Sequence, residues 1–466
     1  MGGVDIHLFR VRKNRFKAGK YGYFCVIIVA AIIPFLVVIW SITALAVNIP
    51  YQDQWTLVPQ IERMSPPGGG IRDLWTQHNE HRLLIPKLIM VHLARLTNWD
   101  IRAELTLNLI LALGAFSIIW RLITSTGDLL HSNLRLILIP LVSILFFSMN
   151  QWENWLWGWQ IQIFICNLSV VAAILILSKS TISTFAFLTS IGLGAIAGCS
   201  FGSGNLIWPI GLIIISCHNS SNKSKYQQFI LWLLIASIFL AVYFSGYRQT
   251  LPVYRMKRFL FEPDLSIWRA YFAYILTYIG APLFPFNQSR AVLAGACGLL
   301  GLLLLSALTI KHHGKYFERV LPVIGIALYA VGAGFSTGLA RAQMGTEQAL
   351  SSRYISISTL FWISVLILTG IYFNVSGGNQ ITPRKLKLFN MVTACILLSV
   401  IFLGIHSSVQ GRNRAARHHA RLESIYVSIQ EDRADDKQLQ YLFPNVTKLR
   451  QYLAILRKRK LSLYHT

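Results

Sequence analysis

The sequence predicts an all-α polytopic membrane protein with about eleven membrane-spanning helices. Of its 466 residues, 54% are hydrophobic and only 13% are charged, whereas soluble chains carry charge at about a quarter of their positions. The apolar residues also gather in blocks of roughly 18 to 25, the length at which a helix crosses the hydrocarbon core of a bilayer. We therefore expect one helical bundle in a membrane.

The N-terminal segment predicts the orientation of that bundle. Residues 1–20 carry six Lys and Arg against one acid, Asp5, and basic flanks stay in the cytoplasm. The apolar run 21–47 that follows is too long for the hydrophobic part of a cleaved signal. We expect a first spanning helix with a cytoplasmic N-terminus, in a cell inner (plasma) membrane.

The apolar blocks then give the spans in order along the chain. We expect them at 22–47, 105–123, 133–149, 160–178, 183–200, 205–216, 228–246, 290–310, 319–339, 354–375 and 386–405. The links that fall in the cytoplasm are short and mostly basic, and the long polar loops face outward. Residues 272–284 are short and proline-bounded, which indicates a re-entrant or interfacial helix, with a full span as the alternative.

Two parts follow from this arrangement. Residues 1–405 form the transmembrane module, with a long first exoplasmic loop at 48–104 that holds interfacial helices. Residues 406–466 form a basic helical tail, which the helix count places outside, whereas its excess of Lys and Arg favours the inside. Its alternative is an amphipathic helix on lipid headgroups.

The net charge of +25 could serve to bind nucleic acid or to contact a membrane surface. The Lys and Arg residues stand mostly between apolar blocks and at the two ends of the chain, as anionic headgroups favour. We expect a lipid bilayer as the partner and no nucleic acid. The six cysteines lie in or beside apolar segments without a CxxC pair, so we expect neither a disulfide framework nor a metal site.

The first loop opens with YQDQW, which puts Asp53 at the membrane surface, where a lipid-linked phosphate also lies. A carboxylate there can take a proton from an acceptor hydroxyl or hold a cation against phosphate. The alternative is a solvated loop acid beside an interfacial tryptophan.

Further along the loop, the sequence HNEHR gathers four ionisable side chains: His78, Glu80, His81 and Arg82. An amphipathic segment follows them, so we expect one interfacial helix over 74–96 with Gln77, His78, His81 and Arg82 on a shared face. That face suits phosphate or sugar recognition. A metal held by the two histidines and Glu80, or plain surface decoration, are the alternatives.

Three further turns carry candidate residues. The turn QWENWLWGWQIQ packs tryptophans around Glu153, Asn154 and Trp155, either as an aromatic belt or as a platform for sugar rings. The glycines of FGSGN, which ends in Asn205, permit close approach of a ligand or a helix.

A third turn ends at Arg353 and Tyr354, which stand at the outer mouth of an apolar helix, where an arginine can pair with a lipid phosphate. A basic rim could contribute to the same site: Arg248, Arg255, Lys257 and Arg258.

Several common catalytic motifs are absent: the Walker loop, the Rossmann glycine fingerprint and HExxH. This absence disfavours a nucleotide-driven pump. Instead, the cytoplasmic first helix, the first-loop acid in YQDQW, the interfacial helices and the many spans together resemble the C-type (GT-C) glycosyltransferase superfamily. HNEHR, ENW, FGSGN and RY at 353–354 resemble bacterial members of it.

The resemblance implies a polyprenyl-phosphate sugar donor, a glycan or lipid acceptor, and Asp53 as catalytic base or as a ligand of metal and acceptor. It implies no certain cofactor and leaves a divalent cation open, with no metal ligand assigned. The chain lacks a WWDYG-type motif and has one Asp where many relatives have a DD or DE pair. The resemblance therefore does not define the acceptor.

The function that we expect is an inverting transfer of a sugar on the exoplasmic face. Asp53 would deprotonate the acceptor, and Arg353 with the basic rim would stabilise the departing phosphate. A lipid-linked saccharide transporter or flippase is one alternative, and a polysaccharide polymerase or ligase is another.

Overall fold

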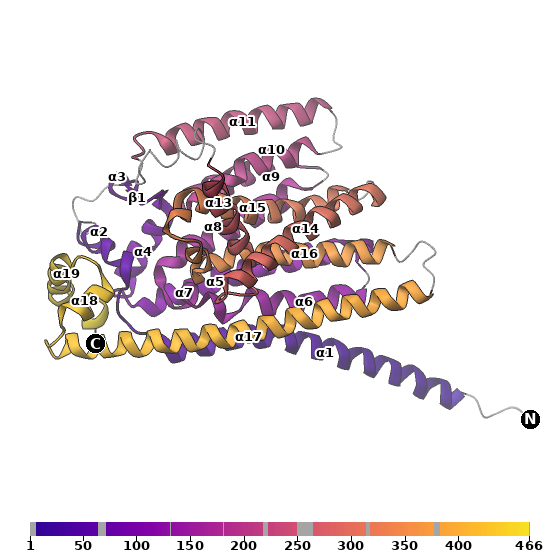
Figure 1. The fold of residues 1–466 in the computed structure, drawn as a ribbon, viewed down its shortest axis with the longest axis horizontal. Coiled ribbons are helices and arrows are strands. Elements are labelled where there is room, and N and C mark those ends of the chain that lie inside the picture. Colours follow the sequence, from indigo (N-terminus) through magenta and orange to yellow (C-terminus); the bar gives the residue numbers. More distant parts are fainter. Residues whose placement is uncertain are drawn as a thin grey trace, which may run out of the picture.

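The computed structural model describes residues 6–63, 71–130, 132–179, 181–217, 222–248, 264–313, 317–376 and 383–465. Long helices lie side by side along one axis of the molecule (Figure 1). Within the described chain, eight helices are long and apolar enough to cross a membrane, and two shorter apolar helices, α9 and α10, accompany them. The prediction of an all-α polytopic membrane protein is confirmed.

The elements follow one another as short and long helices with one small hairpin. Their bounds are α1 (Ile6–Leu45), η1 (Gln52–Leu57), α2 (Val58–Arg63), α3 (Ile71–Leu74), β1 (Gln77–His78), β2 (His81–Arg82), α4 (Leu84–Leu96), α5 (Ile101–Ser125), α6 (Ser132–Phe146), α7 (Trp152–Leu156), α8 (Ile161–Leu177), α9 (Thr184–Gly198), η5 (Gly202–Leu206), α10 (Ile207–Ser216), α11 (Asn222–Phe244), α13 (Leu265–Gly280), α14 (Gln288–His313), α15 (Phe317–Arg341), η8 (Thr346–Leu350), η9 (Ser352–Tyr354), α16 (Ile355–Ser376), α17 (Pro383–Gln430), α18 (Asp436–Leu442) and α19 (Val446–Arg459).

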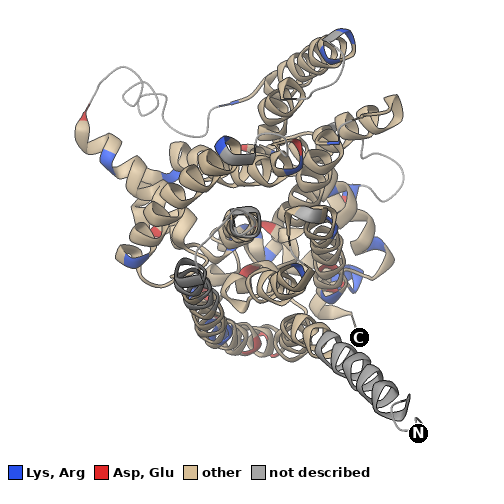
Figure 2. Ribbon diagram, turned by 90° about the vertical axis from the view of Figure 1, so that its right-hand side faces the viewer, with Lys and Arg blue, Asp and Glu red and all other residues tan. Residues whose placement is uncertain are grey.

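The helices begin where short polar side chains satisfy free backbone N–H groups. The Asp100 carboxylate accepts from the amide of Arg102 at the start of α5, and the Ser183 hydroxyl accepts from Ala186 at the start of α9. Seen along the bundle, most of the ribbon carries neither Lys and Arg nor Asp and Glu (Figure 2), as helices immersed in lipid require.

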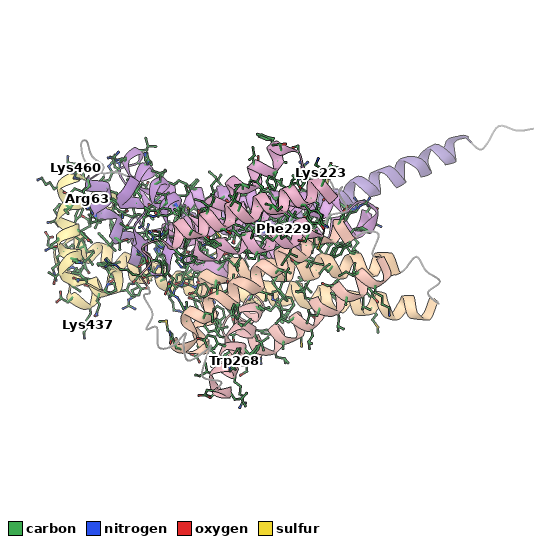
Figure 3. All side chains as sticks on the ribbon, turned by 90° about the horizontal axis from the view of Figure 1, so that it is seen from above. Arg63, Lys223, Phe229, Trp268, Lys437 and Lys460 are labelled. Carbon is green, nitrogen blue, oxygen red and sulfur yellow. The ribbon has the colours of Figure 1, made fainter. Side chains whose placement is uncertain are left out.

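The first loop and the C-terminal tail lie at the same end of the bundle. The Asn48 side chain donates to the Ser462 carbonyl at 3.1 Å, and the Gln52 side chain donates to the Tyr441 carbonyl at 2.7 Å. Figure 3 shows Arg63 of the first loop close to Lys460 of the tail. This is the end at which the helix count places the tail, and α17 runs on through residue 405 without a break.

The expected re-entrant segment forms α13, which has 16 residues and is not among the helices long enough to cross a membrane. The helix before it, α11, ends at the first-loop end, since Tyr243 contacts Arg82 there. The helix after it, α14, begins at the same end, where the Gln288 side chain donates to Thr346. The end of α11 and the beginning of α14 therefore lie on one side of the molecule, and Trp268 of α13 lies at its edge (Figure 3).

Candidate active site

Asp53 lies on η1, a short turn fixed by buried polar groups. The amide of Tyr51 donates to Gln54 Oε1 at 3.0 Å, and Gln54 Nε2 donates to Glu104 Oε2 at 2.6 Å. Gln54 and Glu104 are buried. Gly158 allows the chain to pass against them, because a Cβ there would lie 1.8 Å from Glu104 Oε2. This network holds Asp53 in place.

The cluster HNEHR forms a β hairpin, so the expectation of one helix over 74–96 is wrong: α4 begins only at Leu84. His78 lies opposite His81 in the hairpin. Between them, Asn79 has φ of 50°, a left-handed conformation that asparagine tolerates and that tight hairpin turns require. Facing residues of paired strands project from the same side, so the two histidines remain together.

His78 extends from the hairpin towards Asp53. Its Nε2 lies 3.5 Å from Asp53 Oδ2, and its ring packs against Trp159, with centroids 5.0 Å apart. The carboxylate of Asp53 stays 36% exposed. Asp53 is therefore positioned by its turn and by one loose neighbour, and its oxygens remain accessible to another partner.

His81 packs against the FGSGN turn. Its Nδ1 accepts from the amide N–H of Gly202 at 3.2 Å, and its ring lies on Phe201. A backbone N–H can only donate, so neutral His81 carries its proton on Nε2. Burial lowers the pKa of His81 to about 4, and Arg341 acts in the same direction while Glu80 opposes it. His81 is therefore neutral at pH 7.

Arg82, which we predicted to bind substrate, does not line the cavity. Its guanidinium donates to the carbonyls of Tyr243 at 2.6 Å, Trp75 at 3.0 Å and Ser245 at 2.5 Å, and the residue is 5% exposed. It points away from the histidines because it lies one position further along the strand. Arg82 fastens the hairpin to the end of α11.

Glu80 and Arg341 form a half-buried ion pair across the cavity mouth. Glu80 Oε2 accepts from Arg341 Nη2 at 2.9 Å. Burial favours the neutral acid, but the Arg341 guanidinium and its hydrogen bond lower the pKa of Glu80 below its usual value. The pair links the first loop to the end of α15, and it leaves a fixed positive group beside the cavity.

The backbone of Arg353 is held on both sides by the tryptophan-rich turn. Glu153 Oε2 accepts from the Ser352 hydroxyl at 2.6 Å and from the Arg353 amide at 3.3 Å. Asn154 Nδ2 donates to the Arg353 carbonyl at 3.2 Å. Asn154 is fully buried, so this predicted binding residue lies behind the cavity and supports Arg353.

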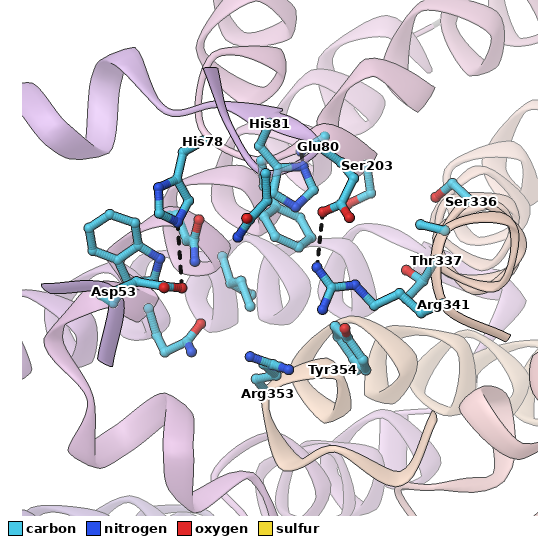
Figure 4. Close-up of a pocket in the computed structure, with 18 of the residues that line it drawn as sticks. Asp53, His78, Glu80, His81, Ser203, Ser336, Thr337, Arg341, Arg353 and Tyr354 are labelled. Atoms are coloured by element: carbon cyan, nitrogen blue, oxygen red, sulfur yellow. Dashed lines mark hydrogen bonds and ion pairs between the residues drawn. The ribbon is translucent and has the colours of Figure 1, made fainter. Parts of the chain in front are cut away.

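The side chain of Arg353 extends into the cavity, between Asp53 and Arg341 (Figure 4). Its Nε is buried and has no hydrogen-bond partner among the residues that the structure describes. The guanidinium carbon lies 5.5 Å from the ring centroid of Tyr354, whose hydroxyl accepts from Gln348 at 3.0 Å. An unpaired, buried guanidinium N–H favours an anionic or polar ligand.

The tryptophans of the second turn divide into two groups. Trp155 is fully buried, donates to the Ser148 carbonyl at 3.0 Å and stacks on Phe164, so it is a core residue and not the predicted binding residue. Trp157 and Trp159 line the cavity instead. They give the cavity a flat aromatic wall.

All these segments surround one cavity of about 520 Å³. Eight of the predicted site residues line it: Asp53, His78, Glu80, His81, Glu153, Asn205, Arg353 and Tyr354. The lining also includes Gln160, Gln162 and Asn205, each with a buried amide atom that no described group satisfies. Such a wall suits a ligand rich in hydroxyl groups.

Asp53 and His78 are two potential metal ligands that lie together in this cavity, with Oδ2 and Nε2 3.5 Å apart. The described part of the chain contains no group of three His, Cys, Asp or Glu side chains placed to hold a metal ion. A divalent cation therefore stays a prediction from the resemblance. The structure describes the side chains of five of the six cysteines, and all five are free thiols: Cys25, Cys166, Cys199, Cys217 and Cys297.

Arg341 was missed in the sequence, although it ends an apolar helix in the same loop as Arg353, which is the pattern that singles out Arg353. The basic rim contributes less than expected. The backbone of Arg248 donates to Gln77 Oε1 at 2.9 Å and accepts from Gln77 Nε2 at 2.6 Å, and the residue does not line the cavity. The other rim residues lie outside the described residues: Arg255, Lys257 and Arg258.

Together, the helices and the cavity define a polytopic membrane protein with an ionisable pocket at the end of its bundle. No family model and no curated protein matches the sequence. Among solved structures, the chain is similar to the archaeal oligosaccharyltransferase AglB from Archaeoglobus fulgidus, in complex with an inhibitory peptide and a dolichol-phosphate. The identity is 14%, the TM-score is 0.44, and the match covers 84% of this chain and 56% of that protein. A likeness this weak transfers neither activity nor substrate.

Proposed function

We propose that this protein is a membrane glycosyltransferase that moves a sugar from a polyprenyl-phosphate donor to a glycan or lipid acceptor. The cavity lies at the first-loop end of the bundle, which the orientation rule places on the exoplasmic face. The observation that carries the proposal is the convergence on one cavity of an accessible carboxylate, Asp53, and an arginine, Arg353, whose buried Nε has no hydrogen-bond partner among the described residues.

Asp53 is the carboxylate best suited to act as the base. Three carboxylates line the cavity. Glu80 is paired with Arg341, and Glu153 accepts two hydrogen bonds that hold η9. Among the residues that the structure describes, Asp53 has one ionisable neighbour, His78 at 3.5 Å, so its oxygens can reach an acceptor hydroxyl.

The reaction is a single displacement. The acceptor oxygen attacks the anomeric carbon, its proton passes to Asp53, and the bond from that carbon to the phosphate oxygen breaks with inversion. The electron pair leaves on the phosphate of the polyprenyl carrier. Positive groups in place before the reaction stabilise such a leaving group most effectively, and Arg353 provides one, with the guanidinium of the Arg341–Glu80 pair beside it.

The remaining lining fits the sugar. Trp157 and Trp159 offer ring faces on which the C–H groups of a hexose can pack. The amide nitrogen of Gln160 and the amide oxygens of Gln160, Gln162 and Asn205 have no hydrogen-bond partner among the described residues. A site that pairs buried polar groups with substrate hydroxyls rejects analogues that lack them. The wall therefore selects for a sugar rather than for an alkyl chain.

A panel of labelled polyprenyl-phosphate sugars, incubated with the purified full-length protein and candidate acceptors, tests the proposal. We expect one donor to yield a glycosylated acceptor with inverted anomeric configuration, together with free polyprenyl phosphate. Transfer with retention would contradict Asp53 as a simple base. Donor binding without turnover for every acceptor and donor in the panel would favour a transporter.

A further inference from the structure

Two further cavities, with volumes of about 330 and 240 Å³, lie between the beginning of α14 and α17. They share Phe286 and Arg414, and they have no lining residue in common with the cavity of Asp53. We refer to them as the arginine groove, defined by Phe286, Gln288, Gln410, Asn413, Arg414 and Arg417.

The groove carries positive charge that no described carboxylate neutralises. No ion pair joins Arg414 or Arg417 to a carboxylate among the described residues, including Glu347, which lines the larger cavity. The Arg414 guanidinium is held in place, with its carbon 3.9 Å from the ring centroid of Phe286. Burial and the neighbouring Arg417 lower the pKa of Arg414 from its ordinary value. An anion between the two arginines would relieve this crowding.

The amide side chains complete a headgroup-sized site. Gln410 and Asn413 lie on α17 beside the two arginines, and Gln288 lies at the start of α14. Amide N–H groups donate to phosphate and glycerol oxygens. The set thus combines charge with neutral donors, as recognition of a phosphodiester requires.

An apolar stripe on α17 runs up to the groove. Its residues are strongly exposed and spaced by four, three and four positions: Leu398, Phe402, Ile405 and Val409. This spacing puts them on one face of the helix, and Gln410 and Asn413 follow directly. The groove therefore lies where exposed apolar surface gives way to positive charge, the level at which a bilayer changes from acyl chain to headgroup.

We propose that the arginine groove binds the phosphate headgroup of an anionic membrane lipid, whose acyl chains lie along the apolar stripe of α17. The site is independent of the sugar-transfer cavity. A soluble phosphate offers the same anion but nothing to cover the stripe. The continuity of charge and apolar surface is what favours a lipid.

Native mass spectrometry of the full-length protein tests this. The probes are dioctanoyl phosphatidylglycerol, dioctanoyl phosphatidylcholine and inorganic phosphate. The test variant is Arg414→Gln/Arg417→Gln. Its control is Arg433→Gln/Arg450→Gln, which removes the same charge from two exposed arginines that already have carboxylate partners, Glu431 and Asp436.

We expect the wild type and the control to prefer phosphatidylglycerol, and the affinity of the groove variant to fall about thirtyfold, as the loss of two arginines near a lipid surface predicts. Equal phosphatidylglycerol binding by the groove variant and the control would overturn the site. Equal binding of the two lipids would overturn the requirement for negative charge. Displacement of the lipid by millimolar inorganic phosphate would overturn the assignment to a lipid.

Discussion

Two arginines of this protein, Arg82 and Arg353, lie at the same end of the bundle in opposite circumstances. On the back of the hairpin, Arg82 donates to three backbone carbonyls and is almost fully buried. At the cavity, Arg353 has its backbone held by Glu153 and Asn154, while its Nε finds no partner among the described groups. The first arrangement stabilises a fold, and the second prepares a side chain for a ligand.

The difference shows that residue type and position in the chain do not separate structural from functional charge. Both arginines stand in polar turns beside apolar helices, and both were predicted to bind substrate. What distinguishes them is whether the protein satisfies their N–H groups. Substitutions should therefore affect stability at the back of the hairpin and activity at the cavity.

The largest effect should come from Asp53→Asn, which removes the proposed base and leaves the shape of the turn intact. Turnover should fall by roughly a hundred to ten-thousandfold, with an unchanged melting temperature in detergent. Asp73→Asn is the matched control, since Asp73 is a first-loop acid outside the cavity that pairs with Arg63 at 3.8 Å. Equal turnover of the two variants would remove Asp53 from the mechanism.

On the structural side of the comparison, Arg82→Ala should destabilise the protein by about 3 kcal/mol, because it leaves buried carbonyls without donors. The measurement is thermal unfolding in detergent, with Arg95→Ala as the control, since Arg95 is exposed on α4. If Arg82→Ala melts like the control but loses donor binding, Arg82 belongs with Arg353 and the distinction fails.

Gly202→Ala tests the contact between the hairpin and the FGSGN turn. A Cβ at this position would lie 2.5 Å from His81 Nδ1, so the histidine must move. Overpacking of this kind costs about 1–3 kcal/mol. We expect a lower melting temperature and weaker sugar binding together. Gly192→Ala has no atom within 4 Å of its new Cβ, and it should behave like the wild type.

The smallest effect is the pH dependence of stability. Burial lowers the pKa of His81, and that of His418 in the tail, to about 4. Between pH 6.5 and about 4 the unfolded chain binds more protons than the folded chain, so stability is full above this window and falls as the pH is lowered. Each histidine should lower the free energy of unfolding by less than about 1 kcal/mol between pH 7 and pH 6. Melting temperatures of His81→Gln/His418→Gln should change less steeply with pH, and an unchanged slope would contradict the burial of both rings.

Features that depend on a short stretch of the chain could be predicted from the sequence. Apolar block lengths predict the helices of the bundle: in the described chain eight are long enough to cross a membrane, and the blocks at 183–200 and 205–216 form the shorter α9 and α10. An acid directly after the first span predicts Asp53 at the cavity. The prediction of secondary structure failed where a turn interrupts a helical pattern of apolar residues. The amphipathic run after Leu83 appeared to extend upstream through HNEHR, but the left-handed Asn79 begins a hairpin there.

Long-range contacts could not be predicted from the sequence, for a different reason. The tail holds the first loop through pairs such as Gln52 with Tyr441 and Asn48 with Ser462, and no local pattern encodes such partners. The role of Arg341 depends in the same way on Glu80 from a distant segment. The pairing of Asn154 with the Arg353 backbone likewise appears only once the fold brings two turns together.

Donor titration of Arg353 variants tests the central claim, that the cavity binds a polyprenyl phosphate through an unsatisfied arginine. The dissociation constant for the polyprenyl-phosphate sugar should rise strongly in Arg353→Ala. It should rise less in Arg353→Lys, which keeps the charge but loses the planar pair of donors. Melting temperatures should stay at the wild-type value. Equal donor affinity in wild type and Arg353→Ala would contradict the claim, because the guanidinium would then serve no ligand.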